Sequence, residues 1–192
     1  MEHRILIAGF GGQGVMVAGQ MLAYTACDTT DLNVTYFPAY GVEQRGGTAN
    51  CTVTISDESI GEVKSAEYDY MIIMNDDSMD KFGGTLSKDG LLIYNTNVVK
   101  QEVKRDSGIT IPVPAVDIAT NAGSEKSANL VMTGVIVGAT EMVPKENVMD
   151  TIHKKLGKKR PELNPVNDKA FLAGYELGKA AVTKESWKEA EQ

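Results

Sequence analysis

The sequence is poor in the residues that hold redox centres. Only two cysteines, Cys27 and Cys51, occur in 192 residues, and they do not form a Cys-x-x-Cys pair. An iron–sulfur cluster or a structural zinc site takes about four such ligands. The two histidines, His3 and His153, also lack neighbouring metal ligands in the sequence. We therefore expect no metal site in this chain alone, and any redox metal must lie on another chain.

Long apolar runs and an excess of positive charge are missing as well. No apolar segment is long enough to cross a bilayer, and the charged, glycine-rich start is unlike a cleaved signal. We therefore expect a cytoplasmic protein with no membrane partner. The formal net charge of −7 argues against nucleic-acid binding, which needs clustered Lys and Arg. The one basic cluster, residues 154–160, falls at the predicted end of a helix and is interpreted as a solvated cap.

The remaining composition is that of one ordinary globular domain. Hydrophobic residues make up 42% of the chain and charged residues 23%. No linker rich in proline and serine divides it, and no internal repeat is present. We expect residues 1–182 to form a single domain and the charged segment 183–192 to be a frayed tail.

The first strand and the glycine-rich turn after it organise the rest of the chain. Apolar residues 5–8 are followed by three glycines in a Gly-x-Gly-x-x-Gly pattern and then by apolar residues at helical spacing. This order predicts a strand, a tight turn and a helix, the first unit of a Rossmann-like α/β domain. The N-terminus of such a helix favours a negatively charged group. The candidate cofactor-binding residues of the turn are Gly9, Gly11, Gly12, Gln13 and Gly14.

The glycine pattern alone does not identify a dinucleotide site. Such a site has an Asp or Glu about 20 residues further on, at the end of the second strand, to hold the ribose hydroxyls. The second predicted strand, residues 33–37, ends at Pro38 without a carboxylate. The turn is therefore interpreted as serving the fold or a ligand shared with a partner chain rather than a bound NAD or FAD.

A second glycine-rich loop, residues 39–48, follows that strand and is unusually polar for a connector. If the first two strands are neighbours in a parallel sheet, this loop and the glycine turn meet at the carboxyl edge, where α/β sheets bind ligands. Helix N–H groups and a guanidinium there would suit a phosphate or a carboxylate. Alternatively, Glu43 and Arg45 pair with each other and the glycines only make a turn. The candidate binding residues of this loop are Tyr40, Glu43, Gln44 and Arg45.

The rest of the pattern predicts a mostly parallel sheet flanked by helices. Residues 48–55 alternate polar and apolar side chains, which predicts an antiparallel edge strand with one less buried face. A short strand near Ile60 would complete this excursion at the edge of the sheet. The other expected strands are 68–75, 91–95 and 109–113, with a turn at 86–90, and the expected helices are 76–82, 115–122, 125–142, 144–156 and 168–181.

The expected helix at 125–142 is apolar on most sides. Gly134 and Gly138 lie one turn apart in it, and small residues at this spacing permit a close backbone approach. We expect this helix to be buried in the core or in a subunit interface. Asn129 is the polar exception and is interpreted as a buried amide with satisfied hydrogen bonds.

Three of these segments, taken in order, resemble the gamma subunit of 2-oxoacid:ferredoxin oxidoreductases. They are the Gly-Gly-Gln-Gly turn at 11–14, the Gln-Arg-Gly-Gly loop at 44–47 and the apolar helix at 129–138. The resemblance covers nearly the whole chain, to about Gly178. It implies a Rossmann-like subunit in a complex with alpha, beta and delta-type chains.

Such complexes decarboxylate a 2-oxoacid with thiamine diphosphate and magnesium, pass electrons through iron–sulfur clusters to ferredoxin and release an acyl-coenzyme A. The Gln44-Arg45 form of the loop resembles that of 2-oxoglutarate enzymes most, with 2-ketoisovalerate and pyruvate enzymes behind. The resemblance also implies that the anion at the glycine turn is coenzyme A or belongs to the thiamine site of an adjoining chain.

The residue inventory fits a subunit that is not catalytic alone. The chain lacks the Gly-Asp-Gly and paired asparagines that hold magnesium and thiamine diphosphate, so we assign no catalytic residue and expect no cofactor held by this chain alone. We expect at least a homodimer in isolation. Two alternatives stay open: a free-standing nucleotide-binding oxidoreductase, and a purely structural assembly subunit whose glycine turn binds nothing.

Overall fold

A six-stranded sheet forms the centre of the computed structural model, which describes residues 2–40, 47–62 and 65–184. The strand order is β2-β3-β1-β4-β5-β6, in which β1, β4, β5 and β6 are parallel and β3 is antiparallel to both β1 and β2. The predicted mostly parallel sheet with an antiparallel excursion at one edge is confirmed. The strands are β1 (Glu2–Phe10), β2 (Asn33–Tyr40), β3 (Thr48–Ser56), β4 (Tyr68–Ile73), β5 (Leu86–Asn95) and β6 (Ile109–Val113).

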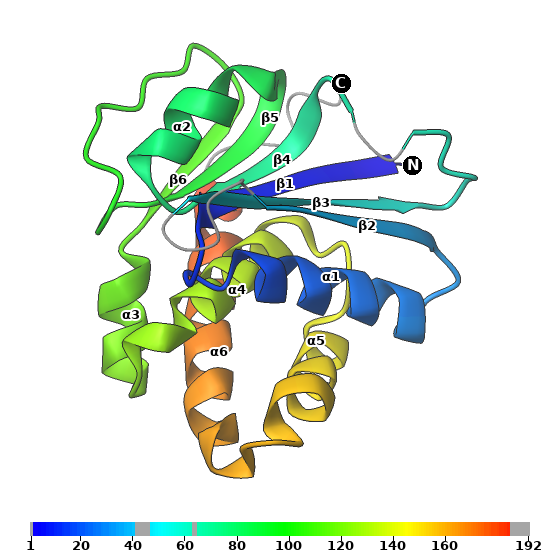
Figure 1. Ribbon diagram of the computed structural model, residues 1–192, viewed down its shortest axis with the longest axis vertical. Helices are drawn as coiled ribbons and strands as arrows, with labels where there is room; N and C mark the ends of the chain where they lie inside the picture. Colours follow the sequence, from blue (N-terminus) through cyan, green and yellow to red (C-terminus); the bar gives the residue numbers. More distant parts are fainter. Residues whose placement is uncertain (1, 41–46, 63–64, 185–192) are drawn as a thin grey trace.

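The helices cover the two faces of the sheet unequally (Figure 1). Helix α2 lies on one face, and the other five lie on the opposite face. Among the described residues, no helix is both long enough and apolar enough to cross a membrane. The helices are α1 (Val15–Thr29), α2 (Asp76–Phe82), α3 (Ala115–Ala122), α4 (Ala128–Thr140), α5 (Lys145–Ile152) and α6 (Asn164–Lys184), with a π-helical turn at His153–Gly157 and 3-10 turns at Gly83–Thr85, Glu125–Ser127 and Pro161–Leu163.

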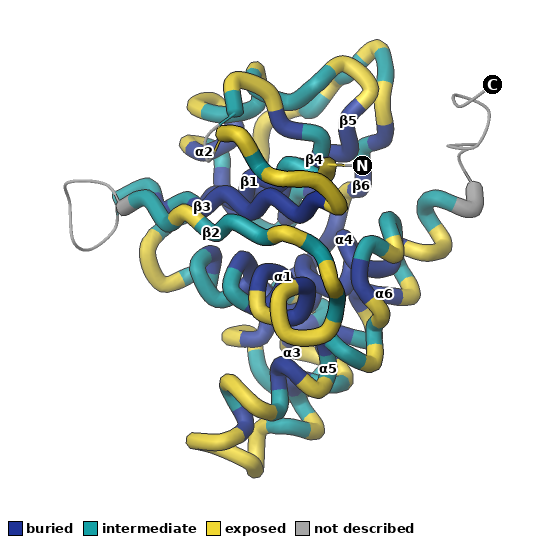
Figure 2. The backbone as a smooth tube through the Cα atoms, turned by 90° about the vertical axis from the view of Figure 1, so that its right-hand side faces the viewer, coloured by how far each residue is buried: buried dark blue, intermediate teal, exposed yellow. Residues whose placement is uncertain are grey.

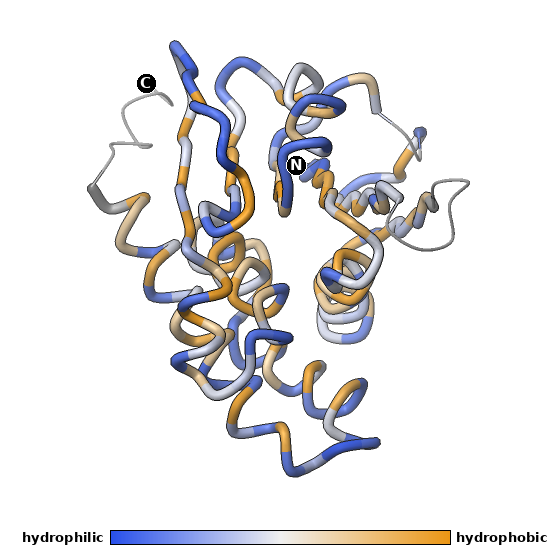
Figure 3. The backbone as a smooth tube through the Cα atoms, turned by 60° about the vertical axis from the view of Figure 1, so that its left-hand side comes forward, coloured by the Kyte–Doolittle hydropathy of each residue, from blue (hydrophilic) through white to orange (hydrophobic). Residues whose placement is uncertain are grey.

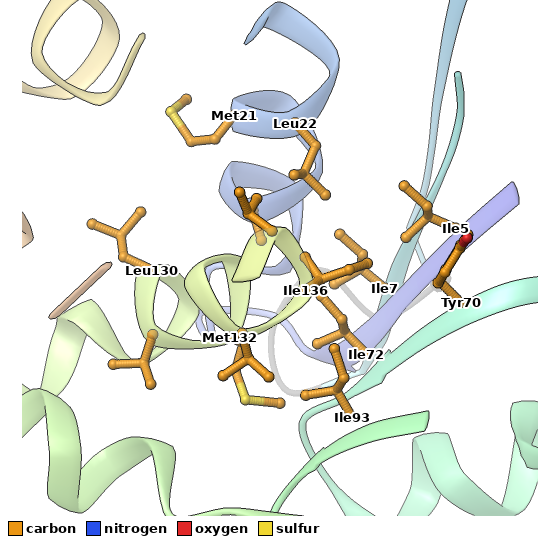
Figure 4. Packing of buried hydrophobic residues seen from close by; sticks show 14 of the residues in the cluster. Ile5, Ile7, Met21, Leu22, Tyr70, Ile72, Ile93, Leu130, Met132 and Ile136 are labelled. Carbon is orange, nitrogen blue, oxygen red and sulfur yellow. The ribbon is translucent and has the colours of Figure 1, made fainter. Parts of the chain in front are cut away.

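Helix α4 is the centre of the main core, because nearly all of its residues are apolar or small. Residues 128–138 are all buried (Figure 2). Figure 4 shows Ile136 of α4 facing Ile7, Ile72 and Ile93 of the sheet. Hydrophilic residues instead gather on outer turns, including the α5–α6 connection at the bottom of Figure 3. Helix α1 packs against β1, β2 and β3, whereas α4 contacts β5 and packs against α1, α3 and α6.

Helices α4 and α6 pack with their backbones in direct contact. A Cβ atom on Gly138 would overlap the carbonyl oxygen of Tyr175, and one on Gly134 would overlap that of Phe171. On α6, Gly174 and Gly178 are equally close to the backbone of α4. We call these four glycines the glycine seam. The close approach expected at Gly134 and Gly138 is confirmed, and it lies inside this chain's own core.

Strand β3 corrects two expectations. It lies between β2 and β1, so the first two strands are not neighbours and β2 is the edge strand. Both of its faces are buried: Thr52 and Thr54 are 6% and 5% exposed, and Val53 on the opposite face is fully buried. The threonines were interpreted as a less buried face. Threonine suits a buried strand as well as a half-exposed one, because its branched Cβ favours the extended backbone.

The segment expected to be a turn at 86–90 belongs to β5. Its pairing with β4 is irregular, since Tyr68 faces Leu86 whereas Tyr70 faces Leu91. The Arg105 guanidinium donates hydrogen bonds to the carbonyl oxygens of Ser87, Lys88 and Gly90. Residues 87–90 are therefore extra residues of β5 that have no partner in the β4 register, and the Arg105 side chain from the loop before β6 holds them.

One expected strand is absent from the described residues, and one helix has different bounds from those expected. Ile60 lies in an irregular segment rather than a strand. Helix α6 begins at Asn164, before the expected start at 168, and continues to Lys184. The rest of the expected tail, residues 185–192, lies outside the described residues.

Candidate functional site

The turn after β1 forms the N-terminus of α1 and leaves it without a side-chain cap. Gly12 and Gly14 have φ angles of +100° and +75°, a backbone region that residues with a Cβ atom rarely adopt. Gly14 is the N-cap residue, and no side chain among the described residues caps the helix there. Backbone N–H groups in the first turn of a helix lack partners within the helix. This terminus can therefore bind an anion.

The side chain of Gln13 holds the turn against the sheet. Its Oε1 accepts a hydrogen bond from the Phe10 N–H at 2.7 Å, and its Nε2 donates to the Met74 carbonyl oxygen at 3.2 Å. These bonds tie the turn to the end of β4, the strand beside β1. The chain leaves β1 toward one half of the sheet and leaves β4 toward the other, which is the switch point where α/β sheets bind ligands. Gln13 thus positions the turn, and its direct contact with a ligand stays a prediction.

The glycine-rich loop meets this turn at its described end. The Gly11 N–H donates to the Gly47 carbonyl oxygen at 3.2 Å. Tyr40 at the end of β2 pairs with Ala49 at the start of β3, and Gly9 near the end of β1 pairs with the same residue. The two segments therefore converge as expected, although they do so through β3. Glu43, Gln44, Arg45 and the side chain of Tyr40 lie outside the described residues.

A cavity of about 470 Å³ opens beside the turn, and the charged residues that line it within the described part of the chain are all positive. We call it the basic cavity. Gly12, Gly14 and Val17 bring the N-terminus of α1 into its wall. Leu130, Leu156, Leu163 and Val166 add apolar surface. The cations that line it are Lys126, Lys155, Lys159 and Arg160.

Three of these four cations are unpaired within the described part of the chain. The Lys155 Nζ lies 3.9 Å from the ring centroid of Tyr24 and 3.9 Å from Asp28 Oδ2. The side chains of Lys126, Lys159 and Arg160 make no ion pair or hydrogen bond with any described residue. An anion in the basic cavity would therefore meet uncompensated positive charge as well as the helix terminus.

Buried polar side chains form the floor of the basic cavity. Ser127, Asn129 and Asn167 line it and are 6%, 7% and 8% exposed. Asn129 Nδ2 donates to the Gly14 carbonyl oxygen at 3.3 Å, and Ser127 Oγ donates to Asn167 Oδ1 at 3.2 Å. Asn129 has the hydrogen bond expected of a buried amide, and that bond supports the glycine turn.

Sequence reasoning missed the cationic wall. Residues 154–160 were interpreted only as a solvated helix cap, whereas Lys155, Lys159 and Arg160 line the cavity beside the glycine turn. The available signal was the concentration of cations in one segment of a chain whose net charge is −7.

A second, smaller cavity of about 220 Å³ shares Gly12 and Lys126 with the basic cavity. It lies where β1, β4 and β5 end, and we call it the edge cavity. The remaining residues that line the edge cavity are Gln13, Met74, Asn95, Val116, Glu125 and Ala128.

Within the described ranges, no group of three or more His, Cys, Asp or Glu side chains is placed to hold a metal ion.

Two of the curated relatives match different lengths of this chain. Subunit VorA of ketoisovalerate oxidoreductase from Methanothermobacter marburgensis is 40% identical over 71% of the chain, but that match spans only 28% of VorA. Subunit KorC of 2-oxoglutarate synthase from the same organism is 34% identical over 92% of the chain and 97% of its own length.

Solved structures and a family comparison agree with these relatives. The gamma subunit of a keto/oxoacid ferredoxin oxidoreductase from Geobacter sulfurreducens has a TM-score of 0.82 at 26% identity, covering 94% of this chain and 98% of that one. Residues 4–177 match the family described as pyruvate ferredoxin/flavodoxin oxidoreductase. The chain therefore belongs to the pyruvate ferredoxin/flavodoxin oxidoreductase family, in which it takes the place of a gamma subunit.

Proposed function

We propose that this gamma subunit supplies the phosphate site for coenzyme A in a complex that oxidatively decarboxylates a 2-oxoacid and passes the electrons to ferredoxin. Alpha, beta and delta-type chains would hold the thiamine diphosphate, magnesium and iron–sulfur clusters, and the complex would work in the cytoplasm. The observation that carries the proposal is the basic cavity beside the uncapped N-terminus of α1.

The chemistry of coenzyme A suits this cavity. Its adenosine end carries a diphosphate and a 3′-phosphate, which match helix N–H groups and unpaired Lys126, Lys159 and Arg160. The apolar wall can cover the adenine ring, and the volume falls in the range of small-molecule sites.

One solved structure supports this choice of ligand through its fold. The 2-oxoglutarate:ferredoxin oxidoreductase from Magnetococcus marinus was determined with 2-oxoglutarate, coenzyme A and succinyl-CoA bound. It has a TM-score of 0.84 to this chain at 24% identity, and the match covers 31% of that longer chain.

We propose 2-oxoglutarate as the preferred 2-oxoacid. The support is the Gln44-Arg45 form of the loop and the match to KorC subunits over more than nine-tenths of this chain. VorA and PorC relatives make 2-ketoisovalerate and pyruvate the competing substrates. In the assembled complex, kcat/KM for 2-oxoglutarate should exceed that for either competitor by about tenfold or more, which is about 1.4 kcal/mol of transition-state stabilisation. A higher kcat/KM for pyruvate or 2-ketoisovalerate would overturn this choice of substrate.

The phosphate site is tested by the double variant Lys159→Ala/Arg160→Ala in the reconstituted complex. A hydrogen bond to a charged group contributes about 1.5–3 kcal/mol. We therefore expect KM for coenzyme A to rise about 10- to 100-fold while KM for the 2-oxoacid stays unchanged.

Arg45→Ala in the same assay tests whether the glycine-rich loop completes the site. We expect the same 10- to 100-fold rise in KM for coenzyme A, about one to two decades.

The matched control is Lys88→Ala/Lys104→Ala. It removes the same charge from two exposed lysines that do not line the basic cavity. If both double variants alter KM for coenzyme A equally, or neither does in an intact complex, the basic cavity is not the phosphate site.

A further inference from the structure

The edge cavity is lined by a buried amide, Asn95, whose nitrogen has no hydrogen-bond partner in the described part of the chain. Asn95, the last residue of β5, is 0% exposed. Its Oδ1 accepts hydrogen bonds from the backbone N–H groups of Asn97 at 3.2 Å and Ala115 at 3.3 Å. These two donors fix which end of the amide is oxygen. The Nδ2 atom has no hydrogen-bond partner among the described residues. An unpaired buried N–H group costs free energy that a bound acceptor would recover.

Asn95 is one of the residues that line the edge cavity. Side chains alternate along a strand, so Asn95 lies on the same face of β5 as Leu91 and Ile93, which pack in the core formed with α4. The edge cavity lies on that face, between the end of β5 and Ala128 at the start of α4. The amide oxygen accepts from Asn97 in the loop after β5 and from Ala115 at the start of α3, so the nitrogen is the polar atom of Asn95 that still lacks a partner among the described residues.

The lining of the edge cavity combines donors, an acceptor and apolar surface. Asn95 Nδ2 and the Lys126 ammonium can donate, whereas the Glu125 carboxylate can only accept. Glu125 and Lys126 together give this lining no net charge, so it suits a free phosphate or carboxylate less well than the basic cavity does. A secondary amide offers a carbonyl oxygen to Asn95 and an N–H to Glu125, and its flanking methylene groups match Met74, Val116 and Ala128. The edge cavity therefore suits a ligand that carries amide groups on an apolar chain.

We propose that the edge cavity binds an amide of the pantetheine arm of coenzyme A, with Asn95 Nδ2 donating to the amide carbonyl oxygen. This inference rests on the proposed function, which puts the phosphates in the basic cavity. Gly12 and Lys126 line both cavities, so the two cavities adjoin and one extended ligand can occupy both. The arm would then leave the glycine turn along the ends of β1, β4 and β5.

The test compares coenzyme A with adenosine 3′,5′-bisphosphate, which has the nucleotide but no arm. Dissociation constants of both are measured by calorimetry on the reconstituted complex carrying Asn95→Asp. This variant keeps the acceptor oxygen for Asn97 and Ala115 and replaces the Nδ2 donor by a second oxygen. We expect affinity for coenzyme A to fall about 10- to 100-fold, about 1.4–2.8 kcal/mol, and affinity for the bisphosphate to change less than about twofold. Asn121→Asp on exposed α3 is the control for the chemical change and should alter neither.

The outcomes separate this inference from the proposed function. If the wild-type complex binds neither ligand, the phosphate site and the arm site both fail. If it binds the bisphosphate but Asn95→Asp leaves coenzyme A unaffected or weakens both ligands equally, only the arm site is wrong. Should Asn95→Asp not assemble, Ala128→Leu decides, because it narrows the edge cavity with Asn95 intact and should weaken coenzyme A selectively.

Discussion

Replacing Gly138 by valine is expected to lower the free energy of unfolding by at least about 3 kcal/mol, at or beyond the upper end of the usual cost of overpacking. The new Cβ atom would overlap the carbonyl oxygen of Tyr175 and lie 2.8 Å from its carbonyl carbon. Both atoms belong to a helix backbone, so no side chain can rotate to make room. The two helices would have to separate, which exposes the core around α4. Urea unfolding followed by circular dichroism measures the loss.

Gly84→Ala is the matched control for Gly138→Val. A Cβ atom there would meet nothing within 4 Å, and the residue does not have a positive φ angle. Such a substitution restricts the unfolded chain and is expected to stabilise by about 0.4–1 kcal/mol. If Gly138→Val unfolds at the wild-type urea midpoint, α4 and α6 do not pack through the glycine seam.

The purified chain alone is expected to reduce no viologen dye with any 2-oxoacid and to contain no iron and no thiamine diphosphate. A [4Fe–4S] cluster takes about four thiolates, and this chain has two cysteines. Burial raises the pKa of the Cys51 thiol to about 12, which keeps it protonated at neutral pH. Only Cys27 is exposed. Dye reduction, iron analysis and thiochrome fluorescence on the pure chain, and again after addition of the partner subunits, measure the effect.

Turnover by the chain alone would contradict this prediction. If that turnover required NAD or NADP, the free-standing oxidoreductase would be the better interpretation. A different result would favour the purely structural alternative: an assembled complex whose affinity for coenzyme A is unaffected by every substitution in the basic cavity and the edge cavity.

Those parts of the fold that depend on neighbouring residues could be predicted from the sequence. The first strand, the glycine turn and α1 follow from short-range patterns, and so do the buried strand β4 and the short strand β6. The insertion of β3 between β2 and β1 could not be predicted, because strand order depends on contacts between distant segments. The alternation around Thr52 and Thr54 also has the same period in an edge strand and an interior strand.

The candidate site divides in the same way. The glycine turn was found because its conformation requires glycine locally, as the positive φ of Gly12 and Gly14 shows. Lys126, Arg160 and Asn95 come from separate elements to line the two cavities beside the turn, and no local pattern links them to it. A lysine or an asparagine is common at helix ends and strand ends for reasons unrelated to ligands. Their placement beside the turn is visible only once the chain is folded.

The hydrogen bond between the Gly11 N–H and the Gly47 carbonyl oxygen fixes one end of the segment between β2 and β3 without using a side chain. Tyr40 is paired with Ala49 across β2 and β3, so the described residues on either side of 41–46 are both held through backbone atoms. Every residue except proline can donate a backbone hydrogen bond. Contacts of this kind at Tyr40 and Gly47 therefore require no particular side chain in the residues between them. The sequence of residues 41–46 can therefore vary between related subunits without altering the backbone contacts that hold Tyr40 and Gly47.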